Sequence, residues 1–235
     1  MLILFEDSHL LVVNKPVGLT VNRSSTTKDE ETLFDWVEQH ASWPLNTAAA
    51  EFNDRRGVVH RLDKDTSGAL IVAKNPQAFA ALQKQFKERT VKKDYRVLVY
   101  GQLGEDFTVN APIGRNPRNR FKQAVAATGR EAVTEFEVTS QFSETTLLRA
   151  FPKTGRMHQI RVHLAALNHA VCGDPIYSPK GLYQEYIELL TKHHIPIRMF
   201  LHAGRVTFAH PVTGAEMAVE AALPPELQVV LKLNQ

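Results

Sequence analysis

The chain has 235 residues, 43% of them hydrophobic, and its 28 basic and 25 acidic residues leave a formal net charge of +3. This composition fits a globular protein with a hydrophobic core, and so small a net charge does not by itself indicate a nucleic-acid partner. Cys172 is the only cysteine, which excludes an intramolecular disulfide and fits a reducing compartment. The apolar N-terminus contains Glu6 and Asp7 and lacks a basic start, so we expect a soluble cytoplasmic protein without a signal peptide or membrane span.

The hydrophobic patterning predicts a chain in which strands outnumber helices. In chain order, strands are expected at 2–5, 10–14, 69–74, 93–100, 109–113, 123–126, 132–139, 145–151, 200–209 and 215–220. Helices are expected at 32–40, from the Asn75-Pro76 start to about residue 89, at 155–168, and after Pro224. Because the strands come in runs joined by short links, the fold class is predicted as α+β, with a mixed, mainly antiparallel sheet.

The first candidate functional string is His60-Arg61-Leu62-Asp63, on a loop directly before a predicted buried strand. Loops on a rigid scaffold commonly present catalytic side chains, and the neighbouring cations could hold a carboxylate ionised or receive a polyanionic substrate. Asp63 is therefore either a functional carboxylate or a turn-capping aspartate, whereas we assign Asp65 to turn capping. The sequence from Asp63 onward also imitates the start of a calcium loop, but Lys74 stands where that loop requires glutamate.

A segment rich in hydrogen-bond donors occupies residues 154–164. On a helix, His158 and Arg161 share one face, and a second face carries three further polar side chains: Arg156, Gln159 and His163. Donors near a helix N-terminus suit phosphates, which the helix dipole also favours. The alternative is a solvated polar face opposite the apolar stripe, and composition alone slightly favours it. The two histidines lack the spacing of a zinc-binding helix, so no metal is expected.

The most basic stretch, residues 114–122, places four cations among nine residues without an acid: Arg115, Arg118, Arg120 and Lys122. Phe121 lies among them, and cationic loops with an aromatic side chain are typical of RNA contacts through phosphate pairing and base stacking. The alternative is the solvated tip of a hairpin. We favour nucleic acid, because neighbouring like charges repel one another unless an anion binds.

The order of these segments resembles that of the RluA-type family of RNA pseudouridine synthases. The resemblance covers nearly the whole chain and rests on the ordered strings ILFEDSHLLVVNKPVGLTV, HRLDKDTSGALIVAKN, KKDYRVLVYG, APIGRNPRNRFKQAV, TGRMHQIRVHLAALNHAVCGDPIY and LHAGRVTFAHPVTG. One departure is Met157, which replaces the threonine of the family's Gly-Arg-Thr-His-Gln string. This replacement removes a hydroxyl next to the expected cleft, but not a catalytic group.

The resemblance implies a pseudouridine synthase catalytic fold with a central active-site cleft. It also implies an isomerase that converts uridine to pseudouridine in structured rRNA or tRNA, without a cofactor, metal or ATP. Asp63 matches the family's essential aspartate, a nucleophile on the ribose or a base, and Arg161 matches the arginine that pairs with it. Tyr95 matches the active-site tyrosine, whose ring stacks on the uracil and whose hydroxyl can help to remove the carbon 5 proton.

The resemblance also implies that the target uridine leaves its stack in the RNA. It implies that Arg61 fills the gap left by the base, and that the 114–122 hairpin binds the RNA. The RNA contacts expected on this interpretation are His60, Arg61, Arg115, Arg118, Arg120, Lys122, Arg156, His158 and Gln159. The family's small RNA-binding domain, often placed ahead of the catalytic one, has no counterpart in the sequence. A single catalytic domain over 1–235, acting as a monomer, is therefore expected.

Two other classes of protein remain as alternatives. The first is an RNA-binding protein that kept the fold and lost the chemistry, and the presence together of Asp63, Tyr95 and Arg161 argues against it. The second is a glycoside hydrolase that uses Asp63. That chemistry needs a second acid facing the first across the substrate, and no string in the chain marks one.

Overall fold

The structure, a computed structural model, describes residues 1–23 and 30–234, without the side chains of residues 120 and 121. The chain forms two compact units. Unit 1 comprises Met1–Lys92 and Ala203–Ala222, and unit 2 comprises Lys93–His202 and Leu223–Gln235. Each unit is therefore assembled from two separate stretches of the chain.

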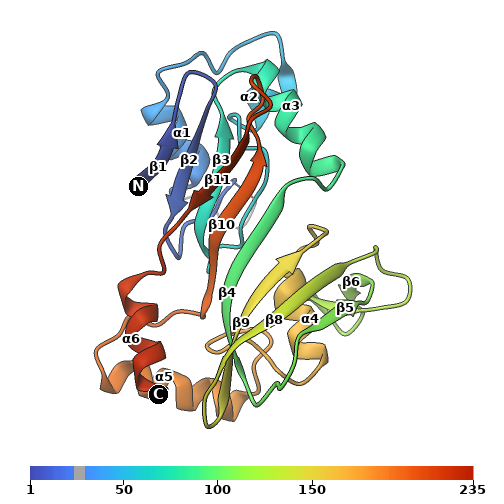
Figure 1. Cartoon of the computed structure of the whole chain (residues 1–235), viewed down its shortest axis with the longest axis vertical. Coiled ribbons are helices and arrows are strands. Elements are labelled where there is room, and N and C mark those ends of the chain that lie inside the picture. The colour runs from blue at the N-terminus through green and yellow to red at the C-terminus, as the bar shows by residue number, and fades with distance from the viewer. Residues whose placement is uncertain (24–29, 235) are drawn as a thin grey trace. The chain divides into compact units, whose positions relative to one another are not determined.

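Unit 1 is built on a sheet in which the strand order is β1-β2-β3-β10, with β11 paired to β10 (Figure 1). Its strands are β1 (Leu2–Glu6), β2 (Leu10–Lys15), β3 (Ser67–Ala73), β10 (Leu201–Ala209, of which the residues from Ala203 belong to this unit) and β11 (Glu216–Glu220). Its helices are α1 (Leu33–His40), α2 (Ala50–Asp54) and α3 (Pro76–Lys87). The pairs β1–β2, β2–β3 and β10–β11 are antiparallel, as expected from the short links between most of them.

Helix α3 begins where the sequence predicts it. The Asn75 side chain accepts a hydrogen bond from the amide of Ala78 at 2.9 Å, and Pro76 occupies the first helical position, where its missing N–H costs nothing. Helix α1 begins with a capping box, in which Thr32 and Asp35 satisfy each other's backbone amides.

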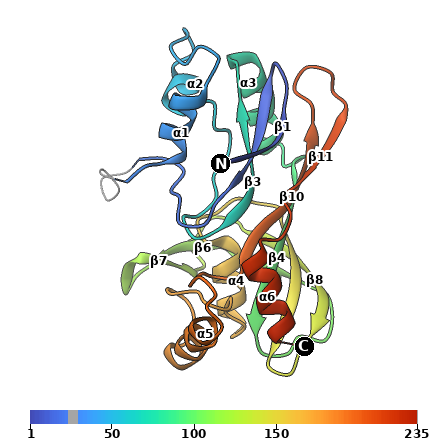
Figure 2. The ribbon, with the colours of Figure 1, turned by 90° about the vertical axis from the view of Figure 1, so that its left-hand side faces the viewer.

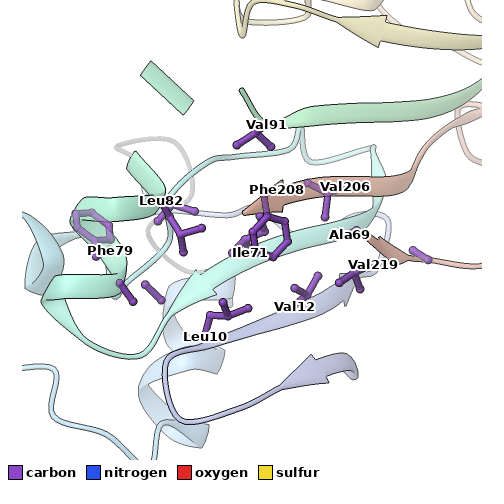
Figure 3. Packing of buried hydrophobic residues seen from close by; sticks show 14 of the residues in the cluster. Leu10, Val12, Ala69, Ile71, Phe79, Leu82, Val91, Val206, Phe208 and Val219 are labelled. Carbon is purple, nitrogen blue, oxygen red and sulfur yellow. The ribbon is translucent and has the colours of Figure 1, made fainter. Parts of the chain in front are cut away.

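Helix α3 packs against one face of the unit 1 sheet (Figure 3). Its Phe79 and Leu82 join a cluster of buried side chains that includes Ile71 of β3 and Phe208 of β10. Strand β3 is buried at all seven positions, so it is covered on both faces. A strand buried on both faces cannot change register without exposing its apolar side chains, and β3 therefore fixes the position of the loop that precedes it.

Unit 2 contains antiparallel strands in the order β4-β9-β8-β5 (Figure 1) and a separate hairpin of β6 and β7 (Figure 2). Its strands are β4 (Lys92–Tyr100, from Lys93 onward), β5 (Phe107–Asn110), β6 (Ile113–Asn116), β7 (Asn119–Val125), β8 (Val133–Gln141) and β9 (Thr145–Pro152). Its helices are α4 (Gln159–Ala166), α5 (Lys180–Lys192) and α6 (Pro225–Leu233). The predicted α+β class with a mainly antiparallel sheet is confirmed.

The two larger apolar clusters of unit 2 hold its helices on its strands. In one, Ile160 and Leu164 of α4 pack on Val97 of β4 and Leu148 of β9. In the other, residues of α5 and α6 surround Cys172, whose thiol has its pKa raised by burial. A thiol with a raised pKa in an apolar setting is unreactive, so Cys172 serves as a small core residue.

The predicted helix at 155–168 is wrong at its start, because α4 begins only at Gln159. His158 has a φ of +57°, a left-handed conformation that an α-helix does not contain. The Gln159 side chain also accepts a hydrogen bond from the amide of Arg156 at 3.0 Å, which holds the preceding residues in a turn. The predicted shared helical face of His158 and Arg161 is therefore wrong as well.

Three further elements differ from the sequence-based expectation. The strand expected at 109–113 is in fact the end of β5 and the start of β6, separated at Pro112, which cannot donate to a sheet ladder. Helices α2 and α5 were not predicted. Helix α2 has only five residues and lies in a weakly patterned segment, whereas α5 carries its buried residues Tyr186 and Leu190 four positions apart.

Glycine at position 68 is required by a close approach within unit 1. A Cβ atom there would lie 2.2 Å from the carbonyl oxygen of Ala203, at a φ of +121°. The Gly68→Ala variant is expected to lose more than about 3 kcal/mol of unfolding free energy, because backbone and not a flexible side chain must move. Gly18→Ala is the matched control: its φ is +81°, but nothing lies within 4 Å of the added atom, so only about 1 kcal/mol is lost. Urea unfolding curves that show equal losses for the two variants would contradict this expectation.

Candidate active site

Asp63 lies on a short loop that leads into β3 of unit 1. Before the loop, Val58 forms an antiparallel bridge with Val72 of β3, and the Leu62 side chain next to Asp63 is buried. Within the loop, the amide of Thr66 donates to the carbonyl oxygen of Asp63 at 3.1 Å. The half-buried Asp63 carboxylate is thus carried by a loop whose two ends are fixed to the same strand.

Lys15 fixes the same loop from a second direction. Its fully buried ammonium donates to three backbone carbonyl oxygens, at 2.9, 2.8 and 3.1 Å: those of Pro16, Leu19 and Lys64. The amide of Gly18 also donates to the carbonyl of Lys64, at 2.9 Å. The Lys-Pro-x-Gly turn after β2 is therefore attached directly to the residue that follows Asp63.

His60, a predicted RNA contact, is bonded into the sheet. Its Nε2 atom accepts a hydrogen bond from the amide of Ile71 at 3.0 Å, and its ring stacks on Phe86 with centroids 4.7 Å apart. Arg61, next to it, has an exposed side chain. The two neighbours therefore differ: His60 helps to hold the loop, whereas Arg61 is accessible to a ligand.

Arg161 of unit 2 forms a buried, bidentate ion pair that the sequence analysis did not identify. Its Nε and Nη2 atoms donate to the two carboxylate oxygens of Asp174, at 2.7 and 2.9 Å, and both side chains are at most 2% exposed. Asp174 also accepts from the amides of Ile176 and Tyr177, at 2.8 and 3.1 Å. The guanidinium lies over the Tyr177 ring, 5.2 Å from its centroid. The direction of the Arg161 side chain is thereby fixed.

A signal for Asp174 was present in the sequence. Arg161 stands between Ile160 and Val162 on a helix that is buried over most of its length, and a buried cation requires a paired acid. Asp174, in the Gly-Asp-Pro string, is the acid that the fold provides.

Tyr95 lies on β4, opposite Ala150 of β9, and its half-buried ring packs against the cluster that contains Ile160 of α4. The neighbouring Asp94 is buried and accepts from the Arg149 guanidinium at 2.7 and 3.2 Å. This pairing raises the pKa of Arg149. Tyr95 and Arg161 therefore belong to one packed body, unit 2, whereas Asp63 belongs to unit 1.

Gln159, another predicted RNA contact, is buried and its amide group is occupied inside unit 2. Its oxygen accepts from the Thr154 hydroxyl at 2.6 Å, and its nitrogen donates to the Thr134 hydroxyl and the Val133 carbonyl, each at 2.9 Å. The Thr134 hydroxyl also lies 2.9 Å from Nδ1 of His163, a residue whose pKa is lowered by burial. This neutral network joins the start of α4 to β8.

Arg156 and His158 flank this network. Arg156 Nε donates to the carbonyl of Glu131 at 2.8 Å, and Nδ1 of His158 lies 2.9 Å from the Tyr177 hydroxyl. That hydroxyl accepts from the amide of Gln123 in β7, at 2.9 Å. The left-handed turn at His158 thus connects α4 with the β6–β7 hairpin.

The predicted basic stretch forms the β6–β7 hairpin (Figure 2). At its tip, the Asn116 side chain accepts from the amides of Arg118 and Asn119, at 2.9 and 3.2 Å, and so holds the turn. Arg115 and Arg118 are exposed, whereas the Lys122 ammonium donates to the carbonyl of Ile176. Arg120 is part of β7, but its side chain is outside the described part of the structure.

Among the described residues, no group of three or more His, Cys, Asp or Glu side chains could hold a metal ion. Nor is any helix in the described part of the chain long and apolar enough to cross a membrane.

Comparison with known proteins identifies the family. A model of the RNA pseudouridylate synthase family matches residues 9–166 of this chain. A "Ribosomal large subunit pseudouridine synthase D" of Nitrosomonas europaea is 39% identical over 230 residues, which cover 98% of this chain and 64% of that protein. A protein of the same name from Xanthomonas campestris is 40% identical over 231 residues, covering 96% and 67%. The chain therefore belongs to the RNA pseudouridylate synthase family, and the resemblance seen in the sequence is confirmed.

The fold agrees with this assignment. The solved structure of human RNA pseudouridylate synthase domain containing 1 superposes with a TM-score of 0.69 at 25% identity, covering 98% of this chain and 93% of that one. The chain spans about two thirds of the length of the curated relatives named above, at 64% and 67%.

The Asp174→Asn variant tests the buried ion pair. It keeps the shape of the side chain but leaves the Arg161 charge without its carboxylate, so we expect a loss of about 3–5 kcal/mol in unfolding free energy. Glu135→Gln is the matched control, because Glu135 pairs with Lys153 at an exposed position and should contribute less than about 1 kcal/mol. Chemical denaturation measures both, and a loss for Asp174→Asn no larger than that for Glu135→Gln would refute the assignment.

Lys93, two residues before Tyr95, should make the folding stability of the protein depend on pH. Its ammonium donates to the carbonyl of Thr154 at 3.1 Å, and burial, aided by the charge of Lys153, lowers its pKa to about 8. Between pH 8 and the unfolded pKa of about 10.4, the unfolded chain binds more protons than the folded chain. Folding stability should therefore rise with pH in this window, by up to about 1.4 kcal/mol per pH unit relative to the Lys93→Met variant. Parallel stability profiles for the two proteins would contradict the lowered pKa.

Proposed function

We propose that this protein converts uridine to pseudouridine in RNA, with Asp63, Tyr95 and Arg161 as the residues that carry the reaction. The observation that supports this most strongly is the match of the family model over residues 9–166, a span that contains all three side chains. The bonded Asp63 loop of unit 1, and in unit 2 the packed Tyr95 ring and the ion-paired Arg161 side chain, are the kind of preorganised supports that catalytic groups require.

The proposed reaction conserves every atom of the nucleotide. The bond from ribose carbon 1 to uracil N1 breaks, the uracil turns, and a new bond forms from carbon 1 to carbon 5. Carbon 5 then loses its proton and N1 gains one, so no oxidant or reductant is consumed. Asp63 acts either by attacking ribose carbon 1 or by removing a ribose proton, and both routes need the carboxylate ionised.

The other two residues have roles that follow from their chemistry. The resemblance gives Arg161 the role of the cation that supports the charge of the reacting carboxylate, and its bidentate bond to Asp174 keeps the guanidinium oriented. Tyr95 supplies a ring face for the uracil and a hydroxyl for transfer of the carbon 5 proton.

Large-subunit ribosomal RNA is the substrate that we propose, because relatives about 40% identical to this chain are named for that RNA. The exposed Arg61, Arg115 and Arg118 side chains are suitable phosphate contacts. The expectations of a cytoplasmic location and of a monomer remain part of this proposal, and light scattering would measure the mass in solution.

The Asp63→Asn variant tests the proposed chemistry. Replacing the carboxylate by an amide of the same shape should reduce pseudouridine formation by at least about a thousandfold, while unfolding free energy and RNA affinity stay near those of the wild type. Asp65→Asn is the matched control, since Asp65 is a half-buried acid two residues away with no proposed part in the reaction, and it should retain activity.

The substrate for this test is a transcript of large-subunit ribosomal RNA, and pseudouridine is measured by mass spectrometry of its nucleosides. Pseudouridine formation by Asp63→Asn at the wild-type rate would exclude the proposed mechanism. A wild-type protein that binds the transcript but never modifies ribosomal or transfer RNA would favour the alternative of a binding protein that has lost the chemistry.

A further inference from the structure

Unit 1 contains a pocket of about 560 Å³ whose wall includes Arg61 but none of the three proposed catalytic residues. Four arginine side chains and three acids form much of its wall: Arg23, Arg55, Arg56 and Arg61, with Asp35, Glu38 and Asp54. The arginines come from the segment before α1, from the end of α2 and from the string that carries Asp63. The volume is in the range of sites that enclose a small organic ligand.

Two of the three acids in the wall, Asp35 and Glu38, are bonded to arginines. Asp35 accepts from the Thr32 side chain and from Arg23, and hydrogen bonding from Thr32 is the largest of the causes that lower its pKa. Glu38 accepts from Nε of Arg56. Because each of these two acids is bonded to an arginine at one edge of the pocket, the two guanidinium groups are ordered before any ligand binds.

Hydrogen bonds to backbone carbonyls also hold two of the arginines in place. Nη1 of Arg56 donates to the carbonyl of Asn53, at the end of α2, and Nη2 of Arg55 donates to the carbonyl of Val59 at 3.3 Å. Arg56 also has a φ of +53°, so its backbone occupies a strained, left-handed conformation. The arginines at this edge are thus held in place by bonds to the main chain as well as to acids.

The chemistry of the wall indicates the ligand. Planar guanidinium groups bind phosphate through paired hydrogen bonds, and Phe34, a half-buried lining residue of α1, offers an aromatic ring on which a base can stack. A phosphate and a base together make a nucleotide. Single-stranded RNA is recognised by this same combination of cationic groups and aromatic faces.

The position of the pocket indicates which nucleotide of the RNA it binds. Arg61, in its wall, stands two residues before Asp63 in the same unit, so their Cα atoms are at most about 7 Å apart. An RNA strand that places a uridine at Asp63 therefore has its adjoining nucleotides near this pocket. We propose that the pocket binds one unstacked nucleotide of the RNA next to the modified uridine, with its phosphate on Arg23 and Arg56 and its base on Phe34. This inference rests on the proposed function.

Binding of a large-subunit ribosomal RNA transcript at several salt concentrations tests the phosphate contacts. The double variant Arg23→Gln/Arg56→Gln should bind at least about 10-fold more weakly at low salt, and the slope of log affinity against log salt should fall by about 1.4, for two lost contacts to a single strand. Arg205→Gln is the control, because Arg205 is an exposed arginine of β10 in the same unit that pairs with Glu220. Its salt slope should equal that of the wild type.

A second measurement needs no variant. The transcript is made with 4-thiouridine, crosslinked to wild-type protein by light, and the protein is digested with trypsin. Residues 29–55 contain no internal lysine or arginine, so Phe34 lies on a single tryptic peptide that ends at Arg55. We expect this peptide to carry a crosslinked nucleotide.

The outcomes separate the pocket from the reaction. If the wild type forms pseudouridine but the double variant keeps the wild-type salt slope and the 29–55 peptide carries no crosslink, the pocket assignment falls and the proposed function stands. If the slope falls and the crosslink appears while Asp63→Asn retains activity, the pocket assignment stands and the proposed mechanism falls. If the wild type binds no RNA at low salt, both fall.

Discussion

The geometry of unit 1 depends on a buried ammonium. Lys15 is fully enclosed at the end of β2, and removing a charged group from water costs several kcal/mol unless polar atoms replace the water. Its three carbonyl partners replace that hydration, and one of them belongs to Lys64 in the loop of Asp63. Moving this loop would leave the ammonium short of an acceptor. The free-energy cost of leaving this buried ammonium without an acceptor therefore helps to hold the candidate catalytic carboxylate in position.

Unit 2 uses a buried charge in a similar way. The Arg161 guanidinium can stay inside the protein because Asp174 accepts both of its parallel hydrogen bonds, and Asp174 in turn accepts from the main chain. The neighbouring Gln159, Thr134 and His163 are neutral groups that satisfy one another. Polar side chains in both units are thus restricted to a single arrangement, which is the condition for rigid placement of reacting groups.

Most of the strands, the class of the fold and the family could be predicted from the sequence. Local signals were sufficient for α3, where Asn75 and Pro76 specify the start without help from the rest of the chain. They failed at α4, because the apolar spacing from Met157 to Leu164 continues through a turn that only contacts with β8 reveal. Asp174 was not predicted although the buried position of Arg161 called for an acid, and the arginine pocket was not predicted because its wall comes from separate segments of the chain. The relation of Asp63 to Tyr95 and Arg161 came from the family resemblance alone, as no local pattern connects them.

The division of the chain into units has a consequence for its synthesis. The family match ends at residue 166, yet the cluster beneath β3 requires Val206, Phe208 and Val219, from the stretch that returns to unit 1. A ribosome makes the Asp63 loop early, but the strand that lies against Gly68 emerges more than a hundred residues later. Until then the apolar face of β3 has no complete cover, and long-range strand pairing of this kind is slow. The cluster that supports the Asp63 loop is therefore incomplete until the stretch from Ala203 to Ala222 has been synthesised.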